Sequence, residues 1–137
     1  MLAARLPFVA VALVCAGLGI YLALSSGGEA RLHRANGHML AGRDAAALAE
    51  LRGLEGEPGR RAAALRGYAQ LGRGQLRQAR TAFRQAVRRD PNNWVLHRDY
   101  AIVLRRLGDR ARARTRMGTA LALNPRMILP PGFAAAK

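Results

Sequence analysis

The chain is poor in cysteine, lysine, acidic residues and aromatic rings. Cys15 is its one cysteine among 137 residues, which excludes an internal disulfide framework and a cysteine-based zinc cluster. Aromatic residues make up 5% of the chain, and the acidic residues number 8 against 22 arginines and the single lysine Lys137, giving a net charge of +15. A hydrophobic fraction of 50% is too high for a disordered polycation, and the length allows one domain.

The N-terminal part carries a long apolar segment. The 19 residues 6–24 contain no charged side chain, and about 20 helical residues cross the hydrocarbon core of a bilayer. Arg5 and Tyr21 stand near its two ends, where such side chains suit the membrane interface. We therefore predict a transmembrane anchor over residues 1–24 and a flexible linker of two serines and two glycines over residues 25–28.

A cleaved secretory signal is the alternative for this segment. Residues 1–5 carry a positive charge, and Ala23 and Ser25 are small residues of the kind found at cleavage sites. The apolar stretch exceeds the usual length of about 7 to 15 residues in a signal peptide, which favours a retained anchor. Arginines on both flanks leave open on which side of the membrane the rest of the chain lies.

A pattern of glycine, alanine, a large apolar residue, alanine and proline occurs twice at an offset of 34 residues. The glycines permit a tight turn between two helices, the alanines let helix backbones approach closely, and the prolines end the second helix. Each unit is therefore a predicted helical hairpin. The two copies contain Gly74, Ala79, Phe83, Ala86 and Pro91, and Gly108, Ala113, Met117, Ala120 and Pro125.

This pattern resembles the tetratricopeptide repeat. Gly67, Ala69 and Ala101 also stand where that family has small residues, whereas Ala63 and His97 replace the tryptophan of its first helix. Upstream, a degenerate copy with helices over residues 29–41 and 44–54 is expected, with Asp44 as an N-cap.

The resemblance implies an all-α fold, a short right-handed α-solenoid of about three helical hairpins behind the transmembrane helix. The expected repeat domain covers residues 29–125, divided into 29–59, 60–93 and 94–125, and an extended tail follows over residues 126–137.

No catalytic or metal-binding constellation is visible in the sequence. His33 and His38 lack the spacing of paired ligands on one helix face, and no serine or glycine-rich loop stands in a nucleophile or phosphate-binding context. We therefore predict that the protein is not an enzyme and uses no metal or cofactor.

Positive charge is concentrated in the two clear repeats. Residues 29–59 have a net charge of −1, whereas residues 60–125 hold sixteen arginines and three aspartates, a net charge of +13. Along the second helix of each repeat, arginines recur three and four residues apart and so lie on one helix face. This face is either a solvated surface or a site for anionic lipid head groups or an acidic partner. Nucleic acid is disfavoured, because no recognition motif is present and aromatic residues are few. This predicted basic face consists of Arg77, Arg80, Arg84, Arg88, Arg112 and Arg116.

In the family that the chain resembles, first helices line an inner groove. The resemblance places Arg61, Arg98 and Arg105 there, where they would hold a carboxylate of a bound peptide. Tyr68 and Ile102 would add apolar contacts, or would pack between the hairpins. These two residues replace the family's clamp asparagines, so recognition of chaperone tails is not expected.

The tail departs from the family, whose arrays usually end in a polar helix. Pro130 and Pro131 prevent such a helix here. Met127, Leu129 and Phe133 either cap the last hairpin or dock into another protein, and we predict that they form a contact site.

Together these features predict a membrane-anchored protein–protein interaction scaffold or accessory subunit that helps to assemble or localise a membrane complex. We expect a single-pass protein of a bacterial inner membrane, because the arginine and alanine bias is typical of GC-rich bacterial genomes. Two alternatives remain. One is a secreted or periplasmic binding module after signal cleavage, and the other is an accessory subunit of an enzyme that acts on an anionic surface polymer.

Overall fold

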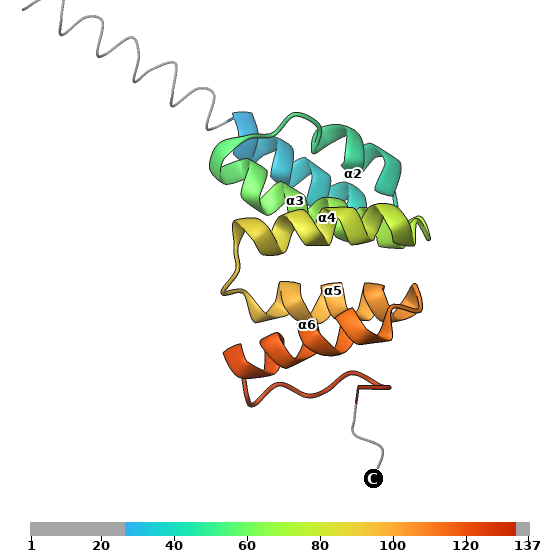
Figure 1. The fold of residues 1–137 in the computed structure, drawn as a ribbon. Helices are drawn as coiled ribbons and strands as arrows, with labels where there is room; N and C mark the ends of the chain where they lie inside the picture. Colours follow the sequence, from blue (N-terminus) through green and yellow to red (C-terminus); the bar gives the residue numbers. More distant parts are fainter. Residues whose placement is uncertain (1–26, 134–137) are drawn as a thin grey trace, which may run out of the picture.

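A computed structural model describes residues 27–133, which form an all-helical stack (Figure 1). Residues 27–40 are helical, and α2 (Asp44–Glu50), α3 (Gly56–Gly72), α4 (Leu76–Arg89), α5 (Trp94–Arg106) and α6 (Arg110–Leu123) follow. The helices form three successive antiparallel pairs, and residues 124–133 then run below α6 without regular structure. The predicted all-α class is confirmed for this part of the chain.

The predicted membrane anchor over residues 1–24 lies outside the described residues. Within residues 27–133, every helix is too short or too polar to cross a bilayer.

Glycine makes the turn within each helix pair. Gly42, Gly74 and Gly108 have φ angles of +68°, +70° and +83°, a region that side chains rarely adopt. The second and third pairs end in a similar way, because Asp90 and Asn124, the residues before proline, leave the helix with φ angles of −140° and −141°. The turns and stops predicted for the two clear repeats are therefore confirmed, and Gly42 provides the same turn upstream.

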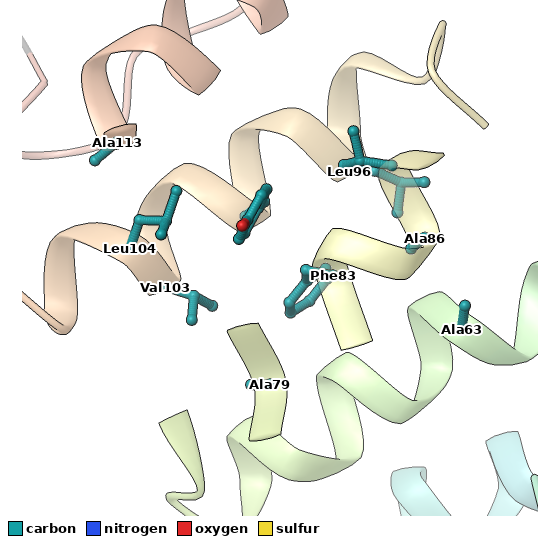
Figure 2. Packing of buried hydrophobic residues seen from close by; sticks show 10 residues of the cluster. Ala63, Ala79, Phe83, Ala86, Leu96, Val103, Leu104 and Ala113 are labelled. Carbon is teal, nitrogen blue, oxygen red and sulfur yellow. The ribbon is translucent and has the colours of Figure 1, made fainter. Parts of the chain in front are cut away.

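The core follows the predicted small and large residues. Phe83 is fully buried and projects from α4 into a cluster with Leu96, Val103 and Leu104 of α5 (Figure 2). Ala79 and Ala86, on either side of Phe83, have exposed fractions of 0% and 1%, so the helices meet over alanine. In the next pair, Met117 and Ala120 form a second cluster with Ala101 and Met127, while Ala113 belongs to the cluster of Phe83. A third cluster joins residues 27–40, α2 and α3 through Leu32, Ala35, Leu51 and Ala62.

The first pair differs from its prediction in two details. Asp44 is the first residue of α2 and caps nothing with its side chain; Arg43 occupies the N-cap position. The helix ends at Glu50 instead of extending to residue 54, because Gly53 turns the chain at a φ of +63° and brings Leu54 into the core.

The segment predicted as a linker, residues 25–28, is partly helical. Gly27 and Gly28 belong to the first helix. Gly28 is buried against Pro58, since a Cβ added to this glycine would lie 2.8 Å from the proline ring. Residues 56–59 form the first turn of α3, where the missing N–H of Pro58 costs nothing. The flexible linker predicted for residues 25–28 is therefore wrong for its second half.

Candidate functional site

A groove of about 700 Å³ is lined by residues from all three helix pairs of the stack. Residues 27–40 and α3 provide two walls, and the turn between α4 and α5 with the start of α5 provides the third. Four apolar residues contribute to its lining, and two of them, Leu32 and Leu96, are 3% and 7% exposed. The lining residues are Glu29, Leu32, His33, Asn36, Glu57, Arg60, Arg61, Ala64, Leu65, Arg89, Asp90, Asn93 and Leu96.

Charged residues at the edge of this groove have partners within the chain. Arg61 contacts Glu29 at 2.7 Å, Arg60 contacts Glu57, and the Arg89 guanidinium donates to the carbonyl of Gly59 at 2.5 Å. Three arginines and three acids line the groove, so their charges balance. Such a surface suits a ligand that is itself mixed in polarity, and not a highly charged one.

Two predicted groove residues, Tyr68 and Arg98, meet at a carboxylate that the sequence reasoning did not single out. The Tyr68 hydroxyl donates to Asp99 Oδ2 at 2.5 Å, and Arg98 Nε donates to Asp99 Oδ1 at 2.7 Å. Asp99 is 8% exposed, and its hydrogen bonds raise the pKa of Arg98. The available signal was its position, because Asp99 lies three residues after Leu96 and four before Val103 on the apolar face of α5.

Tyr68 also packs in the core, as the alternative interpretation expected. Its ring meets Phe83 edge to face, with centroids 5.1 Å apart and planes at 83°. Tyr68 therefore joins α3, α4 and α5, and its hydroxyl fixes Asp99 beside Arg98. The Arg98 guanidinium in turn lies 5.3 Å from the centre of the Trp94 ring.

The Tyr68–Asp99 hydrogen bond predicts a loss of stability at high pH. Burial, followed by the hydrogen bond to Asp99 and its charge, raises the pKa of Tyr68 above its ordinary value of 10.0. Because this pKa is higher in the folded state than in the unfolded state, the neutral hydroxyl contributes its full stabilisation below pH 10.0. That stabilisation is lost as the pH rises through the pKa of the folded state. Tyr68→Phe removes this titration, so its melting temperature is expected to fall less than that of the wild type between about pH 8 and about pH 11.

Thermal unfolding followed by circular dichroism measures this difference. The other tyrosines are common to both proteins, so their titration cancels in the comparison. Equal losses in the two proteins would show that the hydroxyl of Tyr68 does not titrate against the fold.

Ile102 and Arg105 lie apart from the 700 Å³ groove, at the other end of α5. They line a hollow of about 500 Å³ with Arg106, Pro130, Pro131 and Phe133. The Arg105 guanidinium donates to the carbonyl of Pro131 and lies 5.4 Å from the centre of the Phe133 ring. The five predicted groove residues thus divide into three places: Arg61 in the groove, Tyr68 and Arg98 at Asp99, and Ile102 and Arg105 under the tail.

Each of the three arginines predicted to hold a peptide carboxylate has a partner within the chain. Arg61 contacts Glu29, Arg98 contacts Asp99, and Arg105 contacts the tail. A guanidinium has five N–H donors, so these contacts leave donors for a ligand. Binding of a carboxylate at these positions stays a prediction.

The tail residues predicted as a contact site pack against the last hairpin. Met127 is 9% exposed and belongs to the cluster of Ala101, Met117 and Ala120. Leu129 and Phe133 are half-buried against the same cluster. The tail therefore caps the stack in this structure, and docking of these residues to another protein stays a prediction.

Five arginines of the predicted basic face are exposed, and Arg116 is half-buried with its guanidinium 5.6 Å from the centre of the Tyr100 ring. Arg112 pairs with Asp109 at 3.0 Å. Among residues 27–133, the four members of the face on α4 form no ion pair; these are Arg77, Arg80, Arg84 and Arg88.

The described residues offer little for metal binding. Within residues 27–133, no three side chains of histidine, cysteine, aspartate or glutamate gather in a way that holds a metal ion. His97, which replaces the family's tryptophan, is 3% exposed, and its Nε2 bonds the Pro91 carbonyl at 2.9 Å. It fixes the turn that leads into α5.

Comparison with known proteins agrees with the internal repeat. A comparison with curated proteins found no match to the chain. A family model of the tetratricopeptide repeat matches residues 70–126, from the end of α3 to the first residues after α6. That family is typically a non-catalytic repeat that mediates protein–protein interaction. Residues 70–126 are thus similar to the tetratricopeptide repeat in sequence, and the stacked helix pairs of residues 27–133 agree with such a repeat in structure.

Proposed function

We propose that this protein holds a partner polypeptide in the 700 Å³ groove and, anchored by residues 6–24, helps to assemble or localise a membrane complex. The groove itself is the observation that carries this proposal, because all three helix pairs contribute residues to one surface. Helical repeats generally bind their partners on such extended concave surfaces. The match of residues 70–126 to an interaction repeat supports the same class of function.

The lining favours a polypeptide as the ligand. Apolar lining residues such as Ala64 and Leu65 can contact aliphatic side chains. Asn36 and His33 are exposed polar groups of the lining that can bond a peptide backbone. The paired charges of Arg61 with Glu29 leave no uncompensated field that would select a polyanion at this place. A partner segment with alternating apolar and polar residues fits all three features.

A matched pair of alanine substitutions tests the groove. Ala64 lines it on α3, whereas Ala111 is exposed on α6. Ala64→Arg fills the groove and is expected to reduce the amount of a partner captured from membranes by about tenfold or more. Ala111→Arg adds the same charge elsewhere and is expected to leave capture within about twofold. Equal capture by both variants, with unchanged melting temperatures, would reject the groove as the binding surface.

The fate of residues 1–25 tests the anchor. The intact mass of the mature protein and its behaviour in alkaline extraction of membranes separate the two possibilities. A chain that retains residues 6–24 and stays in the membrane fraction supports the anchor. A mature chain that starts near residue 25 supports the alternative, a secreted or periplasmic binding module.

A second candidate function concerns the exposed arginines of α4. Because they form no ion pair within residues 27–133, they are free to contact anionic lipid head groups or an acidic surface polymer. An accessory subunit of an enzyme acting on such a polymer would use this face. Binding to vesicles with anionic lipid is expected to weaken as salt is added, and binding that is insensitive to salt would reject this function.

A further inference from the structure

The last four described residues, Pro130, Pro131, Gly132 and Phe133, form a tight turn. The Phe133 N–H donates to the Pro130 carbonyl at 3.1 Å, and Gly132 has a φ of +84°. Proline at the second position and glycine with positive φ at the third are the requirements of a type II turn. The sequence of this segment therefore favours a type II turn, and this turn places the Phe133 ring near Arg105 of α5.

Arg105 contacts this turn at consecutive residues. Its guanidinium donates to the Pro131 carbonyl and lies 5.4 Å from the centre of the Phe133 ring. It also occupies the space that a side chain at position 132 would need, because a Cβ there would fall 1.8 Å from both terminal nitrogens of Arg105. The contact thus depends on a carbonyl, a glycine and an aromatic ring in consecutive residues.

The turn is held less deeply than the start of the tail. Met127 is 9% exposed within the core, whereas Pro131 and Gly132 are exposed and Phe133 is half-buried. A hollow of about 500 Å³ remains where the turn meets Ile102 and Arg106. Residues 126–129 therefore cap the stack, while the turn lies on α5 as a bound peptide would.

We propose that residues 130–133 are an internal ligand, and that the Ile102–Arg105 surface takes a Pro-Gly-aromatic turn of a partner protein when this tail leaves. The inference rests on the proposed protein-binding function and assigns a second surface to it. A partner segment with a carbonyl, a glycine and an aromatic ring in consecutive residues reproduces the contacts of the tail. An apolar side chain next to this segment in the partner fills the hollow of about 500 Å³. The tail then competes with the partner for Arg105.

Peptide binding to the full chain in detergent micelles tests this proposal. The probe is a fluorescent peptide with the sequence of residues 129–137, and binding is followed by fluorescence anisotropy. Gly132→Ala places a side chain at a positive φ and a methyl group against the end of Arg105, so it is expected to weaken the turn and uncover the surface without shortening the chain. This variant is expected to bind the peptide at least about tenfold more tightly than the wild type, in which the tail covers the surface.

Gly118→Ala is the matched control, because Gly118 is exposed on α6 and an added Cβ meets nothing within 4 Å. It is expected to bind the peptide as weakly as the wild type. A second opening variant, Phe133→Ala, removes the ring instead of the turn and is expected to act like Gly132→Ala. Adding Arg105→Ala to either opening variant is expected to abolish binding, as is replacing phenylalanine in the peptide by alanine.

Equal affinity in the wild type and both opening variants would overturn the proposal, as would absence of binding to both opening variants that still melt cooperatively. The proposed function fails separately. If the opening variants do not bind the peptide, but Ala64→Arg still reduces partner capture, only the second surface is rejected. If the opening variants bind the peptide, but Ala64→Arg does not change partner capture, only the 700 Å³ groove is rejected.

Discussion

Phe83→Ala is expected to destabilise the helical stack by about 3–5 kcal/mol, because it empties the centre of the largest buried cluster. The ring is fully buried and contacts Tyr68 edge to face. It also lies directly over Gly67, where an added Cβ would fall 2.8 Å from the ring. Rigid helix backbones on three sides cannot collapse into the space, so the cavity term is expected to be large.

Urea unfolding followed by circular dichroism measures this effect. Leu40→Ala serves as the control, because Leu40 is 84% exposed and its loss is expected to change stability by no more than about 0.5 kcal/mol. Gly67→Ala should be costly in the wild type and nearly free beside Phe83→Ala, since the small residue no longer meets a ring. Additive effects of the two substitutions would contradict the packing described for Phe83.

Asp99→Ala is expected to cost about 2–3 kcal/mol, because it leaves two donors without their acceptor. The Tyr68 hydroxyl and Arg98 Nε both donate to this buried carboxylate. Two hairpins are joined there, so loosening this contact is also expected to weaken partner capture by the groove. Glu55→Ala, which removes an exposed carboxylate, is the control for the change in charge.

A double-mutant cycle identifies the cause of the loss. Asp99→Ala and Tyr68→Phe remove opposite ends of one hydrogen bond, so their combined cost in urea unfolding is expected to be smaller than the sum of the single costs. A combined cost equal to that sum would show that the destabilisation has another origin.

Features set by neighbouring residues were predictable from the sequence. Gly74 and Gly108 require positive φ, and Pro91 and Pro125 end helices whatever surrounds them. The buried position of Phe83 followed from the alanines around it at helical spacing. Asp44 was wrongly expected to cap a helix, because residue type alone does not fix where the first turn begins.

Contacts between successive repeats were not predictable from local patterns. Arg61 and Glu29 are 32 residues apart, Tyr68 and Asp99 are 31 apart, and Arg105 and Pro131 are 26 apart. These pairings use up groups that look free in the sequence, and they divide one expected groove into separate surfaces. The first two separations are close to the repeat offset of 34 residues, so these pairs join successive repeats, whereas Arg105 contacts the tail that follows the last repeat.

Photo-crosslinking in intact membranes tests the central claim most directly, namely that a partner lies in the groove of residues 27–40, α3 and α5. A photoreactive amino acid at position 64 places the crosslinker in the groove, and the same amino acid at position 115 places it on the exposed side of α6. We expect one defined crosslinked protein from position 64 and none from position 115. Crosslinking of the same protein from position 115 and not from position 64 would contradict it.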